Sequence, residues 1–239
     1  MTEVQRGLNI PEKYLHDDNY AQQIELPKGL DSIPVTSAPY FTLYRLLRYL
    51  KPESVLEIGT QAGVSALVMS LAFRDNKMKS DIICVDPFYP SGDNDGLSTL
   101  TNWYKNIYPS ELKAGIRLIL ATSSEILPQL NKKFDFVFVD GSHQYEDVKY
   151  DCLMALSLLK PGGYFLAHDY VIYESVSRAC NEVIEKLKLP HFVNKIQKNY
   201  RGDLCGWIIA KKTENIDERN IITLHRNKNW FKTLFNQKQ

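Results

Sequence analysis

The sequence contains no long hydrophobic run. No stretch of its 239 residues approaches the ~18 apolar residues in a row that a membrane-spanning helix needs. Residues 1–6 also lack the apolar segment of a secretory leader. We therefore expect a cytoplasmic protein without a membrane partner.

The sequence also has little net charge and few cysteines. Its 29 Lys and Arg residues nearly balance 28 Asp and Glu residues, and a net charge of +1 gives no sign of a nucleic-acid partner. The cysteines at positions 84, 152, 180 and 205 lack the spacing of a zinc or redox motif, so we expect buried thiols. No internal repeat occurs, and 44% hydrophobic residues over this length predict one α/β domain, residues 1–239.

The dinucleotide fingerprint Gly-x-Gly-x-x-Gly is absent too, but a related pattern is present. An apolar run from Val55 contains Glu57, and Gly59 and Gly63 follow it before a helical pattern that includes Ser65. Glycines let the backbone approach a ligand, and the first N–H groups of a helix point at it. The pattern predicts a strand, a tight turn and a helix that bind a ligand without pyrophosphate. A turn that binds nothing is the alternative.

These residues carry a resemblance to a known family. Glu57, Gly59, Gly63 and Ser65, with Thr60 in the turn, resemble motif I of class I S-adenosylmethionine-dependent methyltransferases. Within that class the chain is most similar to the macrocin O-methyltransferase-like and catechol O-methyltransferase-like enzymes, over roughly residues 35–211. The resemblance implies a Rossmann-like fold, in which a seven-stranded, mostly parallel sheet ends in an antiparallel hairpin and has helices on both faces. It also implies S-adenosylmethionine as the cofactor.

The sequence pattern divides the single domain into three parts. We expect an N-terminal lid or capping segment (1–36), a catalytic core (37–212) and a polar tail (213–239). An apolar patch around Trp230 and Phe231 is expected to dock on the body or on another subunit, which would make a homo-oligomer. Apolar periodicity predicts strands over 55–58, 81–85, 116–120, 134–139 and 164–167, followed by a hairpin of 191–196 and 206–210.

Further cofactor contacts are expected after the second and third strands. Asp86 ends the second strand, where an acid commonly accepts hydrogen bonds from ribose hydroxyls. Pro87 and Phe88 offer apolar faces for an adenine, or they are simply a hydrophobic loop that packs on the sheet. The family resemblance implies that Ser123 or Ser124 meets the adenine amino group, although either serine could instead cap a helix.

Acids and imidazoles follow the fourth and fifth strands. Asp140 and His143 follow one strand, His168 and Asp169 the other, and parallel strands bring such side chains to one sheet edge. Asp140, Asp169 and His168 are therefore expected to bind a divalent cation, foremost magnesium. Imidazole suits magnesium poorly, so manganese or iron, a metal held by the two acids alone, and no metal all remain open.

His143 is the expected general base, because an imidazole pKa near 6.5 suits proton abstraction at neutral pH. Asp140-Gly-Ser-His143 resembles the Asp-x-x-His motif of the macrocin-like enzymes, in which one residue is a metal ligand and another is a base. We also expect Asp140 to lie beside the cofactor. We therefore expect metal-assisted O-methylation of a small-molecule or sugar-bearing hydroxyl. One alternative is a metal-independent methyltransferase, which could also act on nitrogen, with His143 or Tyr170 as base. The other is a catalytically silent cofactor-binding or assembly module.

Overall fold

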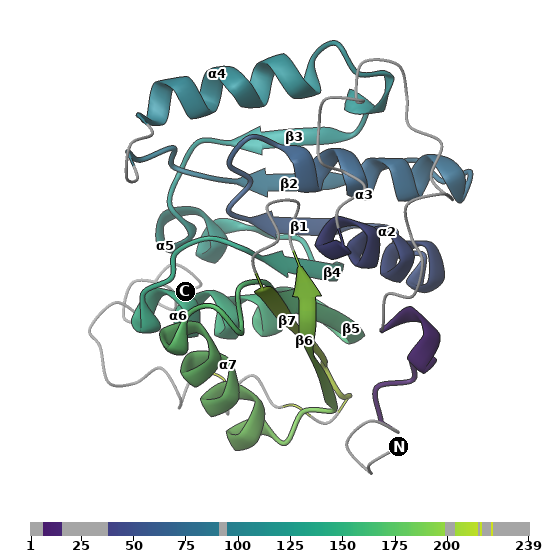
Figure 1. Cartoon of the computed structure of the whole chain (residues 1–239), viewed down its shortest axis with the longest axis vertical. Coiled ribbons are helices and arrows are strands. Elements are labelled where there is room, and N and C mark those ends of the chain that lie inside the picture. The colour runs from purple at the N-terminus through teal and green to yellow at the C-terminus, as the bar shows by residue number, and fades with distance from the viewer. Residues whose placement is uncertain are drawn as a thin grey trace.

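The core of the protein is one mixed sheet. The structure, a computed structural model, describes residues 7–15, 38–90, 95–198 and 204–214 together with residues 216 and 221. The described strands follow the order β3-β2-β1-β4-β5-β7-β6 (Figure 1). Strands β1 to β5 pair in parallel, whereas β7 pairs antiparallel with both β5 and β6, which confirms the predicted fold. The strands are β1 (Val55–Ile58), β2 (Ile82–Val85), β3 (Ile116–Ile119), β4 (Phe134–Val139), β5 (Leu159–Ala167), β6 (His191–Lys198) and β7 (Leu204–Lys211).

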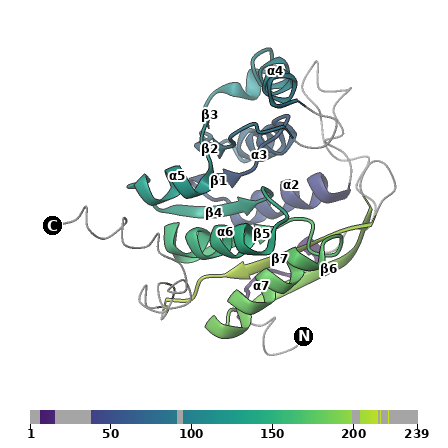
Figure 2. The same cartoon turned by 90° about the vertical axis from the view of Figure 1, so that its left-hand side faces the viewer.

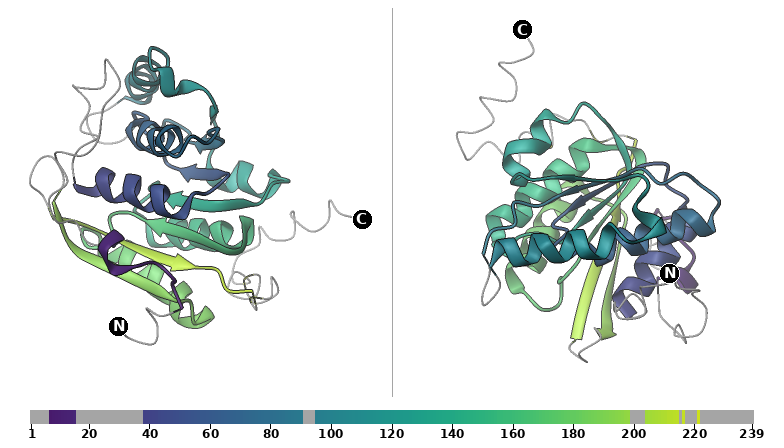
Figure 3. Two further views of the ribbon diagram at one scale, coloured as in Figure 1. Left: turned by 90° about the vertical axis from the view of Figure 1, so that its right-hand side faces the viewer. Right: turned by 90° about the horizontal axis from the view of Figure 1, so that it is seen from above.

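Helices cover both faces of the sheet (Figures 2 and 3). One face carries α2 (Ala38–Leu50), α3 (Val64–Asp75) and α4 (Gly96–Ile107); the other carries α5 (Ser123–Ile126), α6 (Tyr145–Leu158) and α7 (Glu174–Leu187). Short 3-10 turns are η1 (Glu12–Tyr14), η2 (Glu111–Lys113) and η3 (Leu127–Gln129). Within the described ranges, no helix has both the length and the apolar character needed to cross a bilayer.

Strand β4 separates the two hydrophobic cores. Phe136 and Phe138 belong to the core under α2 and α3, whereas Val137 and Val139 belong to the core under α6 and α7. Successive side chains of a strand point to opposite faces, so a strand covered on both sides must be apolar at nearly every position. This central position places Asp140, the next residue, at the middle of the sheet edge.

The sequence-based boundaries of β5 and of the hairpin were too short. The strand begins at Leu159 and runs through Pro161-Gly162-Gly163, whereas the predicted strand began at residue 164. Phe134 pairs with Leu159 and Phe136 with Tyr164, so an irregularity in the β4–β5 register accommodates the additional residues. Strands β6 and β7 each extend to eight residues, because their backbone pairing continues beyond the apolar residues that predicted them.

The described part of the N-terminal segment packs on the body. Leu8, Ile10 and Leu15 are buried in the core beside α2. The Tyr164 hydroxyl donates to the Leu8 carbonyl at 2.8 Å, and the Asn194 amide donates to the Leu15 carbonyl at 3.0 Å. The rest of the proposed lid, and Trp230 and Phe231 of the tail, lie outside the described residues.

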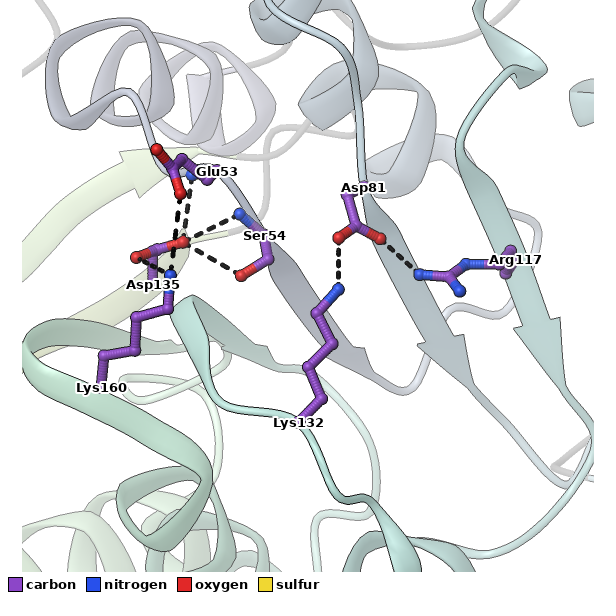
Figure 4. Close-up of polar contacts among 7 residues, drawn as sticks. All are labelled: Glu53, Ser54, Asp81, Arg117, Lys132, Asp135 and Lys160. Carbon is purple, nitrogen blue, oxygen red and sulfur yellow. Dashed lines mark hydrogen bonds and ion pairs between the residues drawn. The ribbon is translucent and has the colours of Figure 1, made fainter.

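Ion pairs line the N-terminal edge of the parallel strands (Figure 4). Asp81 pairs with Arg117 and Lys132. Asp135 lies 2.8 Å from the Lys160 Nζ atom and accepts hydrogen bonds from the Ser54 backbone and hydroxyl, both at 3.0 Å. Partial burial opposes ionisation of both acids, but these partners outweigh it and hold each pKa below its usual value.

Candidate active site

The turn between β1 and α3 lies against the end of β4. Gly59 has φ +83°, and a Cβ atom there would lie 2.2 Å from the Asp140 carbonyl oxygen. Gly63, the N-cap of α3, has φ +79°, and a Cβ there would lie 2.9 Å from a ring carbon of Trp103. Both glycines are therefore needed for backbone conformation and for close packing, whatever ligand the turn binds.

Glu57 is a fully buried acid beneath this turn. Its Oε1 accepts a hydrogen bond from the Ser65 hydroxyl, and its Oε2 has no hydrogen-bond partner among the described residues. Burial raises the Glu57 pKa to about 7, against the opposing effect of Ser65 and Thr60. Thr60 is itself held by the Trp103 indole, which donates to its hydroxyl at 3.2 Å. A positively charged ligand near the turn would stabilise the ionised form of this acid.

Asp86 fixes the shape of the same turn from the end of β2. Its Oδ2 accepts from the backbone N–H groups of Thr60 and Gln61 at 3.0 and 2.9 Å, and its Oδ1 accepts from Phe88 at 2.7 Å. A carboxylate oxygen accepts more than one hydrogen bond, so ribose hydroxyls remain compatible with these contacts. The Phe88 ring is buried in the core, whereas Pro87 is half-buried and keeps a face toward solvent.

The serines after β3 are not needed to cap α5. Thr122 is the N-cap: its side chain accepts from the Glu125 N–H, and the Glu125 carboxylate accepts from the Thr122 N–H at 2.9 Å. This reciprocal pair is a capping box. Ser123 acts on the carboxyl of Asp151 on α6 by opposing the rise that burial causes in its pKa, and the Ser124 hydroxyl lies 3.1 Å from that of Thr122.

The four polar residues after β4 and β5 come together as predicted. His168 Nδ1 lies 3.3 Å from Asp140 Oδ1 and 3.0 Å from Asp169 Oδ1. One ligand atom from each of Asp140, His168 and Asp169 can be chosen so that all three lie within 4.8 Å of one another. His143 Nε2 lies 2.9 Å from Asp169 Oδ2. Asp169 therefore contacts both imidazoles.

The two acids of this cluster are electrostatically different. Burial opposes ionisation of Asp169, but the hydrogen bonds with His143 and His168 outweigh it and hold its pKa well below its usual value. At Asp140 burial outweighs the attraction of His168, and the pKa is raised. Neighbouring acids whose pKa values are pushed apart are common in sites of proton transfer and metal binding.

An apolar cleft borders the cluster on the α2 face of the sheet. Asp140 and His168 contribute to its wall. Its other lining residues are Pro39, Tyr40, Leu43, Phe138, Leu166 and Trp207. The cleft is narrow, with room for about one water molecule.

The chain matches a known domain family over almost half its length: residues 56–170 match the family described as a methyltransferase domain. This part of the chain is similar to a methyltransferase domain. A curated relative, an uncharacterized protein of Acanthamoeba polyphaga mimivirus, is 30% identical over 137 residues. The match covers 56% of this chain and 60% of that protein, so the chain spans less than two thirds of the relative's length.

Solved methyltransferases share the fold. The O-methyltransferase TomG from Streptomyces achromogenes, solved with S-adenosylmethionine, matches with a TM-score of 0.63 and 17% identity, covering 89% of this chain and 100% of that one. An O-methyltransferase from Bacillus cereus, solved with S-adenosylhomocysteine, matches with a TM-score of 0.56 and 16% identity, covering 72% and 79%. The resemblance to class I S-adenosylmethionine-dependent methyltransferases, predicted from motif I, is confirmed.

Sequence reasoning missed one residue beside His143 and one buried acid of α6. Tyr173 stacks on the His143 ring, with centroids 4.0 Å apart and an interplanar angle of 13°; an aromatic four residues after Asp169 gives no signal of such a contact. Asp151 did carry a signal. It is an acid on the stripe of α6 that also contains Val148 and Ala155, and the structure buries it.

Proposed function

We propose that this chain transfers the methyl group of S-adenosylmethionine to a hydroxyl oxygen of a small molecule, with His143 as the general base. The observation that carries the proposal is the 2.9 Å contact between His143 Nε2 and Asp169 Oδ2, at the edge of a methyltransferase fold. A carboxylate that holds one ring nitrogen orients an imidazole and stabilises its protonated form. The other ring nitrogen, Nδ1, is then the atom that takes the acceptor's proton.

The residues at the motif I turn suit the cofactor. Its sulfonium and ammonium groups are cationic, and Glu57 is a buried acid with an unpartnered oxygen in the described structure. The turn from Gly59 to Gly63, with Asp140 against it, would hold the methionine end. Asp86 would hold the ribose and Ser123 the adenine. When bound, the cofactor supplies an electrophilic methyl carbon.

The residues after β4 and β5 suit a divalent cation. Asp140 and Asp169 offer carboxylate oxygens and His168 offers an imidazole nitrogen within one small cluster. A mixed oxygen and nitrogen set accommodates manganese or iron more readily than magnesium. A cation held there would lower the pKa of an acceptor hydroxyl.

The proton follows a short path in this proposal. His143 Nδ1 would take the hydroxyl proton of the acceptor as the acceptor oxygen gains the methyl group, and the cofactor would be left as a neutral thioether. Asp169 stabilises the resulting imidazolium, and Tyr173 fixes the plane of the ring. A general base in such a position typically contributes about 10²–10⁴-fold to the rate.

A metal-independent reaction is the second candidate, and the same contact favours it. His143 and His168 both engage Asp169, so the carboxylate can serve the base without a cation. The two candidates differ in what happens after chelation. If EDTA treatment leaves turnover unchanged, the base alone suffices; if turnover is lost and manganese or magnesium restores it, the cation is required.

The proposal is tested by measuring S-adenosylhomocysteine release with a panel of phenolic, catecholic and sugar-bearing hydroxyl compounds. We expect turnover of at least one acceptor, and a kcat about 10²–10⁴-fold lower in His143→Gln with little change in cofactor affinity. His191→Gln is the matched control, because this histidine starts β6 at the opposite edge of the sheet. Full activity of His143→Gln would overturn the base assignment. Failure of S-adenosylmethionine to bind the unaltered protein would overturn the function itself.

A further inference from the structure

Helix α4 contacts the motif I turn, although none of its residues belongs to the motif. The helix lies beside α3 (Figure 2), and its Trp103 ring packs against Gly63, where a Cβ atom would lie 2.9 Å from a ring carbon. Ile107 packs against the same glycine, with its Cδ1 atom 3.1 Å from that Cβ position. Residues three and four apart share a helix face, so Trp103, Asn106 and Ile107 form one stripe that faces the turn.

Two side chains of this stripe donate hydrogen bonds to the turn. The Asn106 amide donates to the Ala62 carbonyl oxygen at 2.8 Å, and the Trp103 indole donates to the Thr60 hydroxyl at 3.2 Å. Asparagine is a poorer helix former than alanine or leucine, and an apolar residue would serve for packing at this half-buried position. The hydrogen bond therefore explains Asn106 better than packing or helix propensity does.

The hydrogen bond from Asn106 fixes the orientation of one peptide of the turn. The peptide between Ala62 and Gly63 is held on both sides, because its carbonyl accepts from Asn106 and its N–H donates to the Thr60 carbonyl at 2.7 Å. Gly63 lacks a Cβ atom and has positive φ, so the local backbone does not by itself select one orientation of this peptide. The orientation depends on the two hydrogen bonds, and one of them comes from α4.

The other N–H groups of the turn have a different partner. Asp86 accepts from those of Thr60 and Gln61, so it holds the first half of the turn, whereas α4 holds the second half at the start of α3. The first N–H groups of a helix attract anionic groups, and the N-cap Gly63 has no side chain that would occupy them. The carboxylate of the cofactor's methionine part would therefore meet the half of the turn that Asn106 fixes.

We infer that Asn106 is a positioning residue for the methionine end of S-adenosylmethionine: it acts through the Ala62–Gly63 peptide, whose orientation it holds, rather than by contact with the ligand. This inference rests on the proposed cofactor site. It gives α4, which the glycine spacing does not include, a part in cofactor binding. The adenosine part is expected beside Asp86 and the loop after β3, and Asn106 donates to neither. Loss of Asn106 should therefore weaken only ligands that have a methionine end.

The test compares two ligands that differ at that end. S-adenosylhomocysteine has a carboxylate and an ammonium group, whereas 5′-methylthioadenosine has the same adenosine and thioether sulfur but neither charged group. In calorimetric titrations, Asn106→Leu should bind S-adenosylhomocysteine about 3- to 10-fold more weakly, as expected for one lost hydrogen bond, and 5′-methylthioadenosine with a change of less than about twofold. Asn102→Leu is the matched control. It makes the same substitution one turn earlier, at an exposed position of α4, and should change neither affinity.

A second variant keeps the test decisive if the first is unstable. Asn106→Ala also removes the donor, but alanine has the highest helix propensity, so α4 itself should not be destabilised. This variant should show the same selective loss of S-adenosylhomocysteine affinity. An equal loss for both ligands would show that Asn106 only supports the fold, and it would overturn the inference. No loss for either ligand would do the same. If S-adenosylhomocysteine does not bind the unaltered protein, the proposed function fails instead.

Discussion

Acids lie at both ends of the parallel strands, but their partners differ. At the N-terminal edge, Asp81 and Asp135 are paired with lysine or arginine, and their pKa values are lowered (Figure 4). At the C-terminal edge, Glu57, Asp140 and Asp151 have raised pKa values, and burial is the first cause in each case. The acids of the first edge are paired with cations of the chain, whereas at the second edge Asp169 is the acid whose pKa is lowered, by its contacts with His143 and His168.

This difference separates acids that stabilise the fold from acids that are available to a ligand. Paired acids stabilise the folded state themselves, since their partners are part of the chain. Buried acids without cationic partners cost stability, and a bound ligand or ion that binds only the folded state offsets that cost. Substitutions at the two edges should therefore affect different measurements.

The largest expected effect is on catalysis at the C-terminal edge. Asp169→Asn removes the negative charge that orients and stabilises protonated His143, so kcat should fall about 10²–10⁴-fold. The melting temperature should also fall, because the lowered pKa of Asp169 means that its charge stabilises the folded state. The paired experiment is Asp135→Asn at the other edge, which should leave kcat within about twofold. Equal losses of activity in the two variants would break the comparison between the edges.

The next effect concerns pH and the ligand-free protein. The Glu57 pKa is about 7 in the folded state against an ordinary value of 4.5, so the folded state binds this proton more tightly. The resulting stabilisation is complete below about pH 4.5 and is lost as pH rises to about 7, up to roughly 3 kcal/mol in total. Glu57→Gln should flatten this part of the pH profile of the unfolding free energy, measured by urea denaturation, and should weaken S-adenosylhomocysteine binding. A profile unchanged by the substitution would mean that Glu57 is ionised in the folded protein at neutral pH.

A smaller effect is expected for stability at the N-terminal edge. Asp135→Asn removes the ion pair with Lys160 and weakens the hydrogen bonds from Ser54, at a site that is partly buried. The expected loss is about 2 kcal/mol in the free energy of unfolding. Because the pKa of Asp135 is lowered, its stabilisation is present at neutral pH and is lost as pH falls below about 4. Chemical denaturation at pH 7 and pH 3 measures the size of this loss and its dependence on pH. Cofactor affinity is the control and should not change.

The fold, and the sheet edge at which the site lies, could be predicted because both follow from local sequence patterns. Strands such as β4 have apolar residues on both faces, and the residue after each parallel strand must lie at the same edge. This places Asp140 and Asp169 together before any contact is known. The family resemblance added the cofactor, which the glycine spacing alone did not specify.

The rest depends on contacts between residues distant in the sequence. The stacking of Tyr173 on His143 and the engagement of Asp169 by both histidines are set by side-chain conformations that strand order does not determine. The β5 boundary was missed because Pro161 and Gly162 favour turns locally, whereas pairing with β4 and β7 extends the strand. Asp151 shows a further limit: its position on an apolar stripe was visible, but its unpartnered oxygen was not.

The smallest predicted effect lies at an exposed ion pair of the N-terminal edge. The Arg117 side chain is 59% exposed, and Asp81 keeps Lys132 as a second partner when Arg117 is replaced. Arg117→Gln should therefore cost only about 0.5 kcal/mol of unfolding free energy, because solvent screens an exposed pair. Lys132→Gln removes the less exposed cation, at 34%, and should cost more than Arg117→Gln in the same denaturation experiment. A larger loss of unfolding free energy in Arg117→Gln than in Lys132→Gln would mean that burial does not set the strength of these ion pairs. The two edges would then differ only in whether their acids have cationic partners.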